Sequence, residues 1–180
     1  MSERHAFRAK WHDYNAGIYF ITICSHNLQH IFGTITGGRF YPTELGSLVA
    51  AHLALLPDWH ADTELWNYVV MPNHIHFVLA VRTGCPFVVS SGENKRHPGC
   101  LKPPMHGDEA EDYHHNSRLA MIIGAFKAGV SRVSRAELNL REPCWHSRFH
   151  EHIIRNQRSL ENIMTYIDNN VLNWDKDCYY

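Results

Sequence analysis

Two histidines begin a short apolar stretch, and their spacing suits metal binding. His74 and His76 are separated by one residue, and apolar residues continue from there to Val81. In a strand, side chains two residues apart share a face, so both imidazoles would point the same way. Imidazole nitrogens bind divalent cations, and two of them on a rigid strand supply half of a metal site. Two ordinary histidines beside a hydrophobic core are the alternative.

A tyrosine and an asparagine lie one helical turn apart near the C-terminus. Segment 160–171 has apolar residues at helical spacing, and Ser159 is the expected N-cap. Tyr166 and Asn170 fall together on the flank of that apolar stripe, where residues four apart are neighbours. A tyrosine with a purely structural role would more naturally lie within the stripe. The pair is therefore a candidate for chemistry.

A second pair of histidines occurs in segment 149–154, which is expected to be a strand. His150 and His152 would share one face of that strand, and Glu151 would lie on the other. A second metal-binding pair, a polar strand edge and a phosphate-facing patch are all consistent with this pattern.

Basic residues gather in two parts of a chain whose formal net charge is −1 with neutral histidine. The first 17 residues mix basic and aromatic side chains, which suits phosphate contact and base stacking. The candidates there are Arg4, Arg8, Lys10, Trp11 and Tyr14. Between positions 119 and 158, seven Lys or Arg residues stand against three acids, and the candidates for DNA contact are Lys127, Arg132, Arg135, Arg148 and Arg155. A loosely ordered arm and a solvated helix face are the alternatives.

Strands and helices must bring these side chains together. The patterns predict strands at 18–24, 64–71, 74–81 and 149–154, and helices at 44–56, 117–139 and 160–171. A smaller hairpin is expected around Gly37-Gly38, and Pro72-Asn73 would form the tight turn before 74–81. Segment 74–81 is largely apolar on both faces, which places it in the centre of the sheet. The predicted fold is α+β, a central antiparallel β-sheet with helices packed on it.

The length of 180 residues suggests a single domain, 1–180. Segment 82–116 lacks periodicity and is rich in Gly and Pro, so we expect a variable loop insertion at about 82–116. No apolar run is long enough to cross a membrane, and no apolar signal core is present. The five cysteines are scattered without a Cys-x-x-Cys pair, which fits a reducing cytoplasm.

The chain resembles a known family at several of these places. His74-Ile75-His76 resembles the histidine–hydrophobic–histidine (HUH) motif of the single-tyrosine endonucleases. The wider stretches resemble the REP-associated tyrosine transposases and related insertion-sequence transposases. These stretches are 17–24, 69–76, 124–127, 145–155 and 166–170, which together leave out mainly 82–116. One departure is Val171, where the family usually has proline after the asparagine.

The resemblance implies a ferredoxin-like sandwich, in agreement with the predicted order of elements. It also implies a nucleophile, Tyr166, and metal ligands His74 and His76, with Asn170 as a third ligand. Two imidazoles and an amide oxygen suit Mg²⁺ or Mn²⁺ with open positions for phosphate oxygens. The implied partner is single-stranded hairpin DNA, and the implied product is a 5′-phosphotyrosine that allows strand transfer.

Two alternatives to this transposase-like nuclease and strand transferase stay open. One is a catalytically inactive hairpin-DNA-binding protein, and intact Tyr166, His74 and His76 argue against it. The other is a hydrolase that uses the metal to activate water. The sequence leaves open whether the protein is a monomer or a homodimer.

Overall fold

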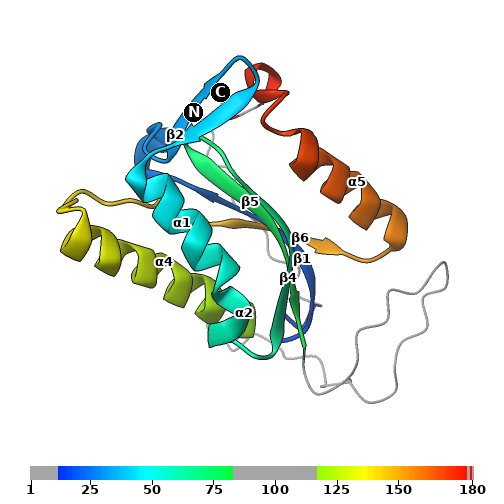
Figure 1. The fold of residues 1–180 in the computed structure, drawn as a ribbon. Coiled ribbons are helices and arrows are strands. Elements are labelled where there is room, and N and C mark those ends of the chain that lie inside the picture. The colour runs from blue at the N-terminus through cyan, green and yellow to red at the C-terminus, as the bar shows by residue number, and fades with distance from the viewer. Residues whose placement is uncertain (1–11, 83–116, 178, 180) are drawn as a thin grey trace.

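A four-stranded antiparallel sheet forms the centre of the molecule (Figure 1). The computed structural model describes residues 12–82, 117–177 and 179. The strands of the sheet are β1 (Gly17–Cys24), β4 (Thr63–Val70), β5 (His74–Val81) and β6 (His150–Ile154), in the order β4-β5-β1-β6. β5 is antiparallel to both β4 and β1, so those two strands run parallel with β5 inserted between them. This split βαβ arrangement confirms the predicted α+β, ferredoxin-like fold.

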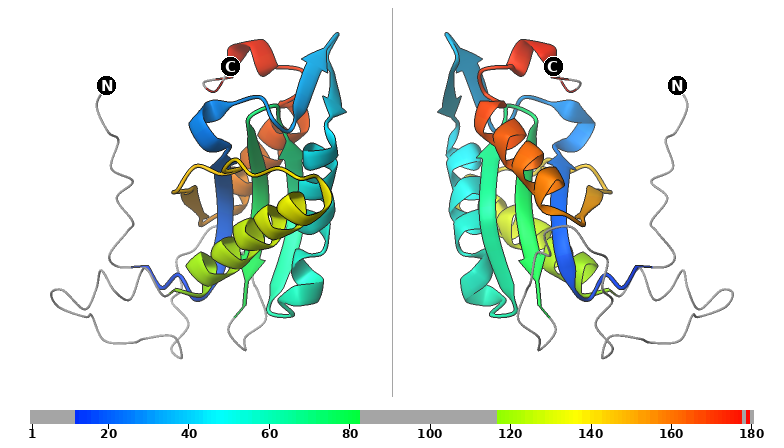
Figure 2. Two further views of the ribbon diagram at one scale, coloured as in Figure 1. Left: turned by 90° about the vertical axis from the view of Figure 1, so that its left-hand side faces the viewer. Right: turned by 90° about the vertical axis from the view of Figure 1, so that its right-hand side faces the viewer.

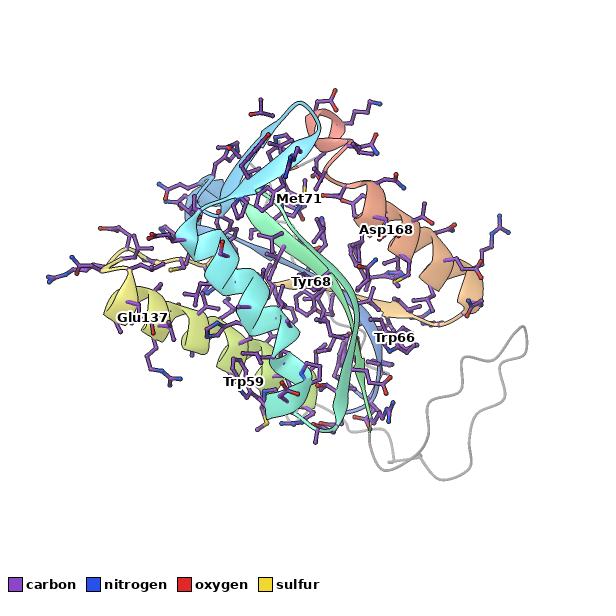
Figure 3. The ribbon with its side chains drawn as sticks, in the orientation of Figure 1. Trp59, Trp66, Tyr68, Met71, Glu137 and Asp168 are labelled. Atoms are coloured by element: carbon purple, nitrogen blue, oxygen red, sulfur yellow. The ribbon has the colours of Figure 1, made fainter. Side chains whose placement is uncertain are left out.

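Helices cover both faces of the sheet. α1 (Glu44–Ala54) and α4 (Arg118–Glu137) pack on one face, and α5 (Gln157–Asn169) packs on the other. Strand side chains alternate between the two faces. The odd-numbered residues of β5 accordingly join the α1/α4 core, whereas Val78 and Ala80 join the α5 core. Figure 3 shows Trp59 on the α1 side and Trp66 on the α5 side.

The smaller elements follow the sequence pattern closely. β2 (Gly33–Thr36) and β3 (Arg39–Pro42) form the predicted hairpin, and Gly37 and Gly38 have φ of 59° and 72°. Two consecutive positive φ angles are what a type I′ turn needs, which explains the glycine pair. The remaining elements are η1 (His26–Leu28), α2 (Leu56–Trp59) and η2 (Trp174–Lys176).

Two helix boundaries differ from the prediction. The pattern predicts a helix over 44–56 that Pro57 ends, but α1 ends at Ala54 and Pro57 lies in the first turn of α2. Proline is tolerated there because the first-turn N–H groups have no intrahelical partner. The N-cap of α5 is Asn156 instead of Ser159, and its side chain accepts a hydrogen bond from the Ser159 N–H at 2.8 Å.

Central placement of β5 is confirmed, and every residue from His74 to Val81 is buried. The insertion expected at about 82–116 lies outside the described residues except for Arg82. Within the described ranges, no helix combines the length and apolar character needed to span a membrane.

Two glycines in helices provide a matched test of this packing. A Cβ on Gly46, in α1, would overlap the carbonyl oxygen of Phe32, whereas a Cβ on Gly124, in α4, meets nothing within 4 Å. We expect Gly46→Ala to lower the free energy of unfolding by about 1–3 kcal/mol through overpacking. Gly124→Ala should raise it by about 0.5–1 kcal/mol through helix propensity. Urea unfolding measures both, and equal effects of the two variants would contradict the close approach at Gly46.

Candidate metal and tyrosine site

The turn between β4 and β5 fixes the first histidine. The Met71 N–H donates to the His74 carbonyl at 2.9 Å, which closes the turn (Figure 3 labels Met71 there). The Ser25 N–H donates to the Asn73 carbonyl at 2.8 Å, and the Phe32 N–H donates to the Pro72 carbonyl at 3.0 Å. The turn is therefore tied to the chain on either side of η1, and β5 starts from a fixed backbone.

The predicted pairing of His74 and His76 on one face is present in the structure. The two side chains are buried, and their ring centroids are 4.5 Å apart. Residues of β5 at even positions face α5, so the histidine pair lies on the opposite side of the sheet from α1 and α4.

Asn73 determines which nitrogen of His74 carries the proton. The Asn73 Nδ2 donates to the carbonyls of Tyr179 and Leu28, at 2.7 and 3.3 Å. Its Oδ1 then faces His74 Nδ1 at 2.9 Å and accepts a hydrogen bond from it. The proton on Nδ1 leaves the lone pair on Nε2, the nitrogen that can bind a metal.

His76 is held on both sides of its ring. Its Nδ1 lies 2.8 Å from Thr22 Oγ1, on the neighbouring strand β1. Its Nε2 lies 3.2 Å from the hydroxyl of Tyr166, which can donate to it. Of these two side chains, Tyr166 is exposed to solvent and His76 is buried.

Burial keeps both imidazoles neutral. It lowers the pKa of His74 to about 3. The pKa of His76 is also lowered to about 3, by burial first and by His74 second, against an opposing effect of Asp177. Since a histidine binds metal in its neutral form, neither ring needs to lose a proton at neutral pH.

α5 places Tyr166 over the histidines. The helix packs through Ile167 and its apolar neighbours onto the β4–β5 part of the sheet, and Asp168 accepts a hydrogen bond from Asn67 of β4 at 2.8 Å (Figure 3 labels Asp168). The Tyr166 ring contacts Phe20 edge to face, with centroids 5.9 Å apart. The predicted tyrosine and the predicted histidines are therefore brought together from α5 and β5.

Two buried side-chain atoms of the predicted ligands have no hydrogen-bond partner within the described residues. They are His74 Nε2 and Asn170 Oδ1. Asn170 follows the last residue of α5, one turn after Tyr166, and is 3% exposed. An unpaired buried acceptor is costly unless something binds it. Two of the three predicted metal ligands, His74 and Asn170, therefore have an acceptor atom in this state, whereas His76 Nε2 lies against the Tyr166 hydroxyl.

One acidic residue at the site was missed in the sequence. Ligand atoms of His74, His76 and Asp177 all lie within 4.8 Å of one another. The Asp177 Oδ2 is 3.7 Å from His74 Nε2 and 3.5 Å from the Tyr166 hydroxyl. Two neutral imidazoles with a carboxylate nearby form a donor set that fits a divalent cation.

The chain beyond α5 folds back onto the histidines. The Tyr179 ring lies against the His74 ring with centroids 4.7 Å apart, and the Trp174 ring is 6.1 Å from it. No spacing or periodicity in the last ten residues indicates this return. The hydrogen bond from Asn73 to the Tyr179 carbonyl holds the returning chain in place, and it joins distant parts of the sequence.

The predicted DNA-contacting residues are distributed over different surfaces. Lys127, Arg132 and Arg135 belong to α4, on the sheet face opposite the histidines. Arg148 and Arg155 are exposed and flank β6 at its two ends. Arg4, Arg8, Lys10 and Trp11 lie outside the described residues.

Tyr14 is the one member of this set that the structure corrects. Its side chain is 2% exposed and stacks on Tyr19, with ring centroids 5.9 Å apart. A buried ring cannot stack on a base, so the expected role in base stacking was wrong. Aromatic character near basic residues indicated nucleic-acid contact, but here it serves the hydrophobic core.

Segment 144–149 connects the α4 surface to the edge of the sheet beside the histidines. The His146 N–H donates to the Cys24 carbonyl at 2.9 Å, and Cys24 pairs with His74 across β1 and β5. Lys127 Nζ donates to the carbonyls of His146 and Ser147 at 2.7 and 3.0 Å. A surface hollow of about 260 Å³ lies on the outer side of this segment and is lined in part by Lys127 and Arg135.

Comparison with known proteins finds similarity to a curated sequence and to solved structures. No protein-family model matches the chain. An uncharacterized protein of Haemophilus influenzae is 28% identical, over 98% of this chain and 93% of that protein. The solved structure of a REP-associated tyrosine transposase bound to a REP hairpin matches with a TM-score of 0.50 and 16% identity, covering 97% of this chain and 74% of that one. A candidate transposase of Deinococcus radiodurans R1 matches with a TM-score of 0.44 and 13% identity, covering 94% and 97% of the two chains. The likeness to the first structure shows a shared fold across nearly the whole chain.

Proposed function

We propose that this protein is a metal-dependent, transposase-like enzyme that cleaves and rejoins single-stranded DNA next to a hairpin. One observation carries the proposal: the Tyr166 hydroxyl lies 3.2 Å from His76 Nε2, in a site with buried, neutral histidines and an unpartnered His74 Nε2. The shared fold with a transposase that was solved on a REP hairpin supports it. In this proposal, residues 1–180 form a single transposase-like domain.

Tyr166 would act as the nucleophile. Its phenolic oxygen gives up its proton and forms a bond to the scissile phosphorus, while the bond from phosphorus to the 3′-oxygen breaks and that oxygen takes up a proton. The products are a 5′-phosphotyrosine and a free 3′-hydroxyl, and a second 3′-hydroxyl can reverse the exchange on another strand end. In the structure the Tyr166 hydroxyl lies 3.2 Å from His76 Nε2 and 3.5 Å from Asp177 Oδ2, so either group can accept the phenol proton.

His74, His76, Asn170 and Asp177 are the residues that would hold Mg²⁺ or Mn²⁺. When bound, the cation would supply neutralisation of the phosphate charge that opposes attack. His76 Nε2 has one lone pair, so binding a metal there and accepting the Tyr166 hydrogen bond exclude each other. With a cation on His76 Nε2, the Tyr166 hydroxyl would lose this partner and would be available to the phosphate.

The hairpin would bind through the basic residues at the β6 edge and on α4. Since α4 lies on the far face of the sheet, a duplex in contact with Arg132 and Arg135 has to pass segment 144–149 to reach the histidines. Lys127 fixes the position of that segment by donating hydrogen bonds to the carbonyls of His146 and Ser147. The N-terminal basic residues stay part of the proposal as further phosphate contacts.

A double substitution on α4 tests this placement. Arg132 and Arg135 are both exposed, so Arg132→Ala with Arg135→Ala should weaken hairpin binding with little effect on folding. We expect the slope of log Kd against log salt to fall by about one for each phosphate that the protein no longer neutralises. Fluorescence anisotropy over a salt series measures it, with Arg39→Ala on β3 as the control. An unchanged slope in the double variant would remove α4 from the DNA interface.

The reaction itself is tested by capturing the covalent product. The protein is incubated with Mn²⁺ or Mg²⁺ and single-stranded hairpin oligonucleotides taken from the DNA that flanks its gene. A DNA–protein adduct on a denaturing gel supports the proposal. Binding without cleavage would favour the inactive hairpin-binding protein, and release of a free 5′-phosphate without an adduct would favour the hydrolase.

A further inference from the structure

The sheet face that carries His74 and His76 has exposed side chains at its β6 edge. α5 lies on this face (Figure 2, right-hand panel) and packs on β4 and β5, and Ile18 of β1 and Ile154 of β6 join the same core. On β6, the edge strand next to β1, the side chains of His150 and His152 are exposed. Among the described residues, these are the histidines that share the sheet face of His74 and His76 without being covered by α5.

The strand register connects the two histidine pairs. Thr22 of β1 pairs with His76 on one side and with His150 on the other. Directly paired residues of antiparallel strands point to the same face, so His76, Thr22 and His150 form one row across the sheet. In the next row, Phe20 pairs with Val78 and with His152.

Side chains of β1 and β5 are in contact along these rows. Thr22 Oγ1 is 2.8 Å from His76 Nδ1, and the Phe20 ring stacks on the His76 ring with centroids 5.1 Å apart. The row that contains the buried His76 and Thr22 ends at the exposed His150. The next row ends at the exposed His152, which pairs with the half-buried Phe20.

The chemistry of this surface suits a phosphate backbone. Neutral histidine has one ring N–H that can donate to a phosphate oxygen. The acidic residue of β6, Glu151, pairs with Ile21 and points to the other face. Arg148, exposed just before β6, adds positive charge at the start of the strand.

We propose that His150 and His152, with Phe20 beside them, bind the single strand next to the cleavage point and so position the scissile phosphate at Tyr166. His76 and His150 stand two strands apart, about 10 Å, so His150 would contact a different phosphate from the scissile one. The second histidine pair is in this view a positioning element for the substrate, and not a second metal site. The inference rests on the proposed function.

The test uses hairpin oligonucleotides in which single phosphates near the cleavage point are replaced by neutral methylphosphonates. In the wild-type protein, one such replacement within about two nucleotides of the cleaved bond should slow adduct formation about tenfold, as expected when a charge-assisted hydrogen bond is removed. In His150→Ala with His152→Ala, the unmodified DNA should react about tenfold more slowly. The same replacement should then cause no further slowing.

Controls separate this inference from the proposed function. His52→Ala changes a histidine of α1, on the opposite face of the sheet, and should keep the wild-type pattern. His150→Gln with His152→Gln repeats the test with side chains of similar size, and circular dichroism checks the folding of each variant. If the double variants stay as sensitive to the replacements as wild type, the inference is overturned while the proposed function stands. If unmodified DNA gives no adduct with wild type, the proposed function fails, and this inference with it.

Discussion

Tyr166→Phe should abolish the covalent DNA adduct while leaving hairpin binding unchanged. The substitution removes one oxygen and keeps the ring, so the edge-to-face contact with Phe20 is retained. The Tyr166 side chain is 42% exposed, and its hydroxyl reaches His76 and Asp177, so we expect a change in stability of less than about 1 kcal/mol. Without the phenolic oxygen, no 5′-phosphotyrosine can form. Denaturing gels with a suicide hairpin substrate measure the adduct, and anisotropy measures binding.

Tyr179 provides the matched control for this experiment. Its ring also lies beside His74, at 4.7 Å between centroids, which makes it the competing tyrosine by position. Tyr179→Phe should form the adduct at close to the wild-type rate. Mass spectrometry of the trapped complex should find DNA on the peptide that contains Tyr166. DNA on a peptide that contains Tyr179 would show that the assignment of the nucleophile is wrong.

His76→Ala and His74→Ala should each reduce cleavage by more than about 100-fold, because loss of residues that merely support metal ligands already costs about 10–100-fold. Hairpin binding should persist, since contacts to the phosphates supply most of the affinity. Titration with Mn²⁺, followed by calorimetry, should show weaker metal binding in both variants. The pKa values of both rings are lowered to about 3, so neither ring has to lose a proton at neutral pH before it binds a metal. We therefore expect the Mn²⁺ affinity of the wild-type protein to vary little between about pH 6 and 8.

Two graded variants sharpen this prediction. Asn73→Ala removes the acceptor that holds the proton on His74 Nδ1, and should weaken metal affinity by about 10–100-fold. Asp177→Asn tests whether the nearby carboxylate adds to the site. His52→Ala on α1 serves as the control for loss of a histidine. Undiminished metal-dependent cleavage in His74→Ala or His76→Ala would contradict the assigned site.

Much of the fold could be predicted because it depends on local patterns. The period-two and helical patterns identified the strands of the main sheet and the three long helices, and the glycine pair identified the small hairpin. The boundaries at Pro57 and Asn156 were less accurate, because capping and first-turn tolerance depend on single side chains. Tyr14 was misplaced because an aromatic residue near basic residues has the same local pattern in a core and in a DNA-binding arm.

The sequence by itself determined that His74 and His76 share a face and that Tyr166 and Asn170 are neighbours, because strand and helix periodicity fix such relations within one element. Only the tertiary structure decided which elements meet. The β1–β5 register brings Thr22 to His76, the packing of α5 on the sheet brings Tyr166 to the same ring, and the return of the chain brings Asp177 beside both. Those contacts join residues 11 to 90 positions apart, and no spacing pattern in the sequence indicates them. They arise because the apolar faces of distant elements bury one another, and the polar groups carried on those elements are brought together as a consequence.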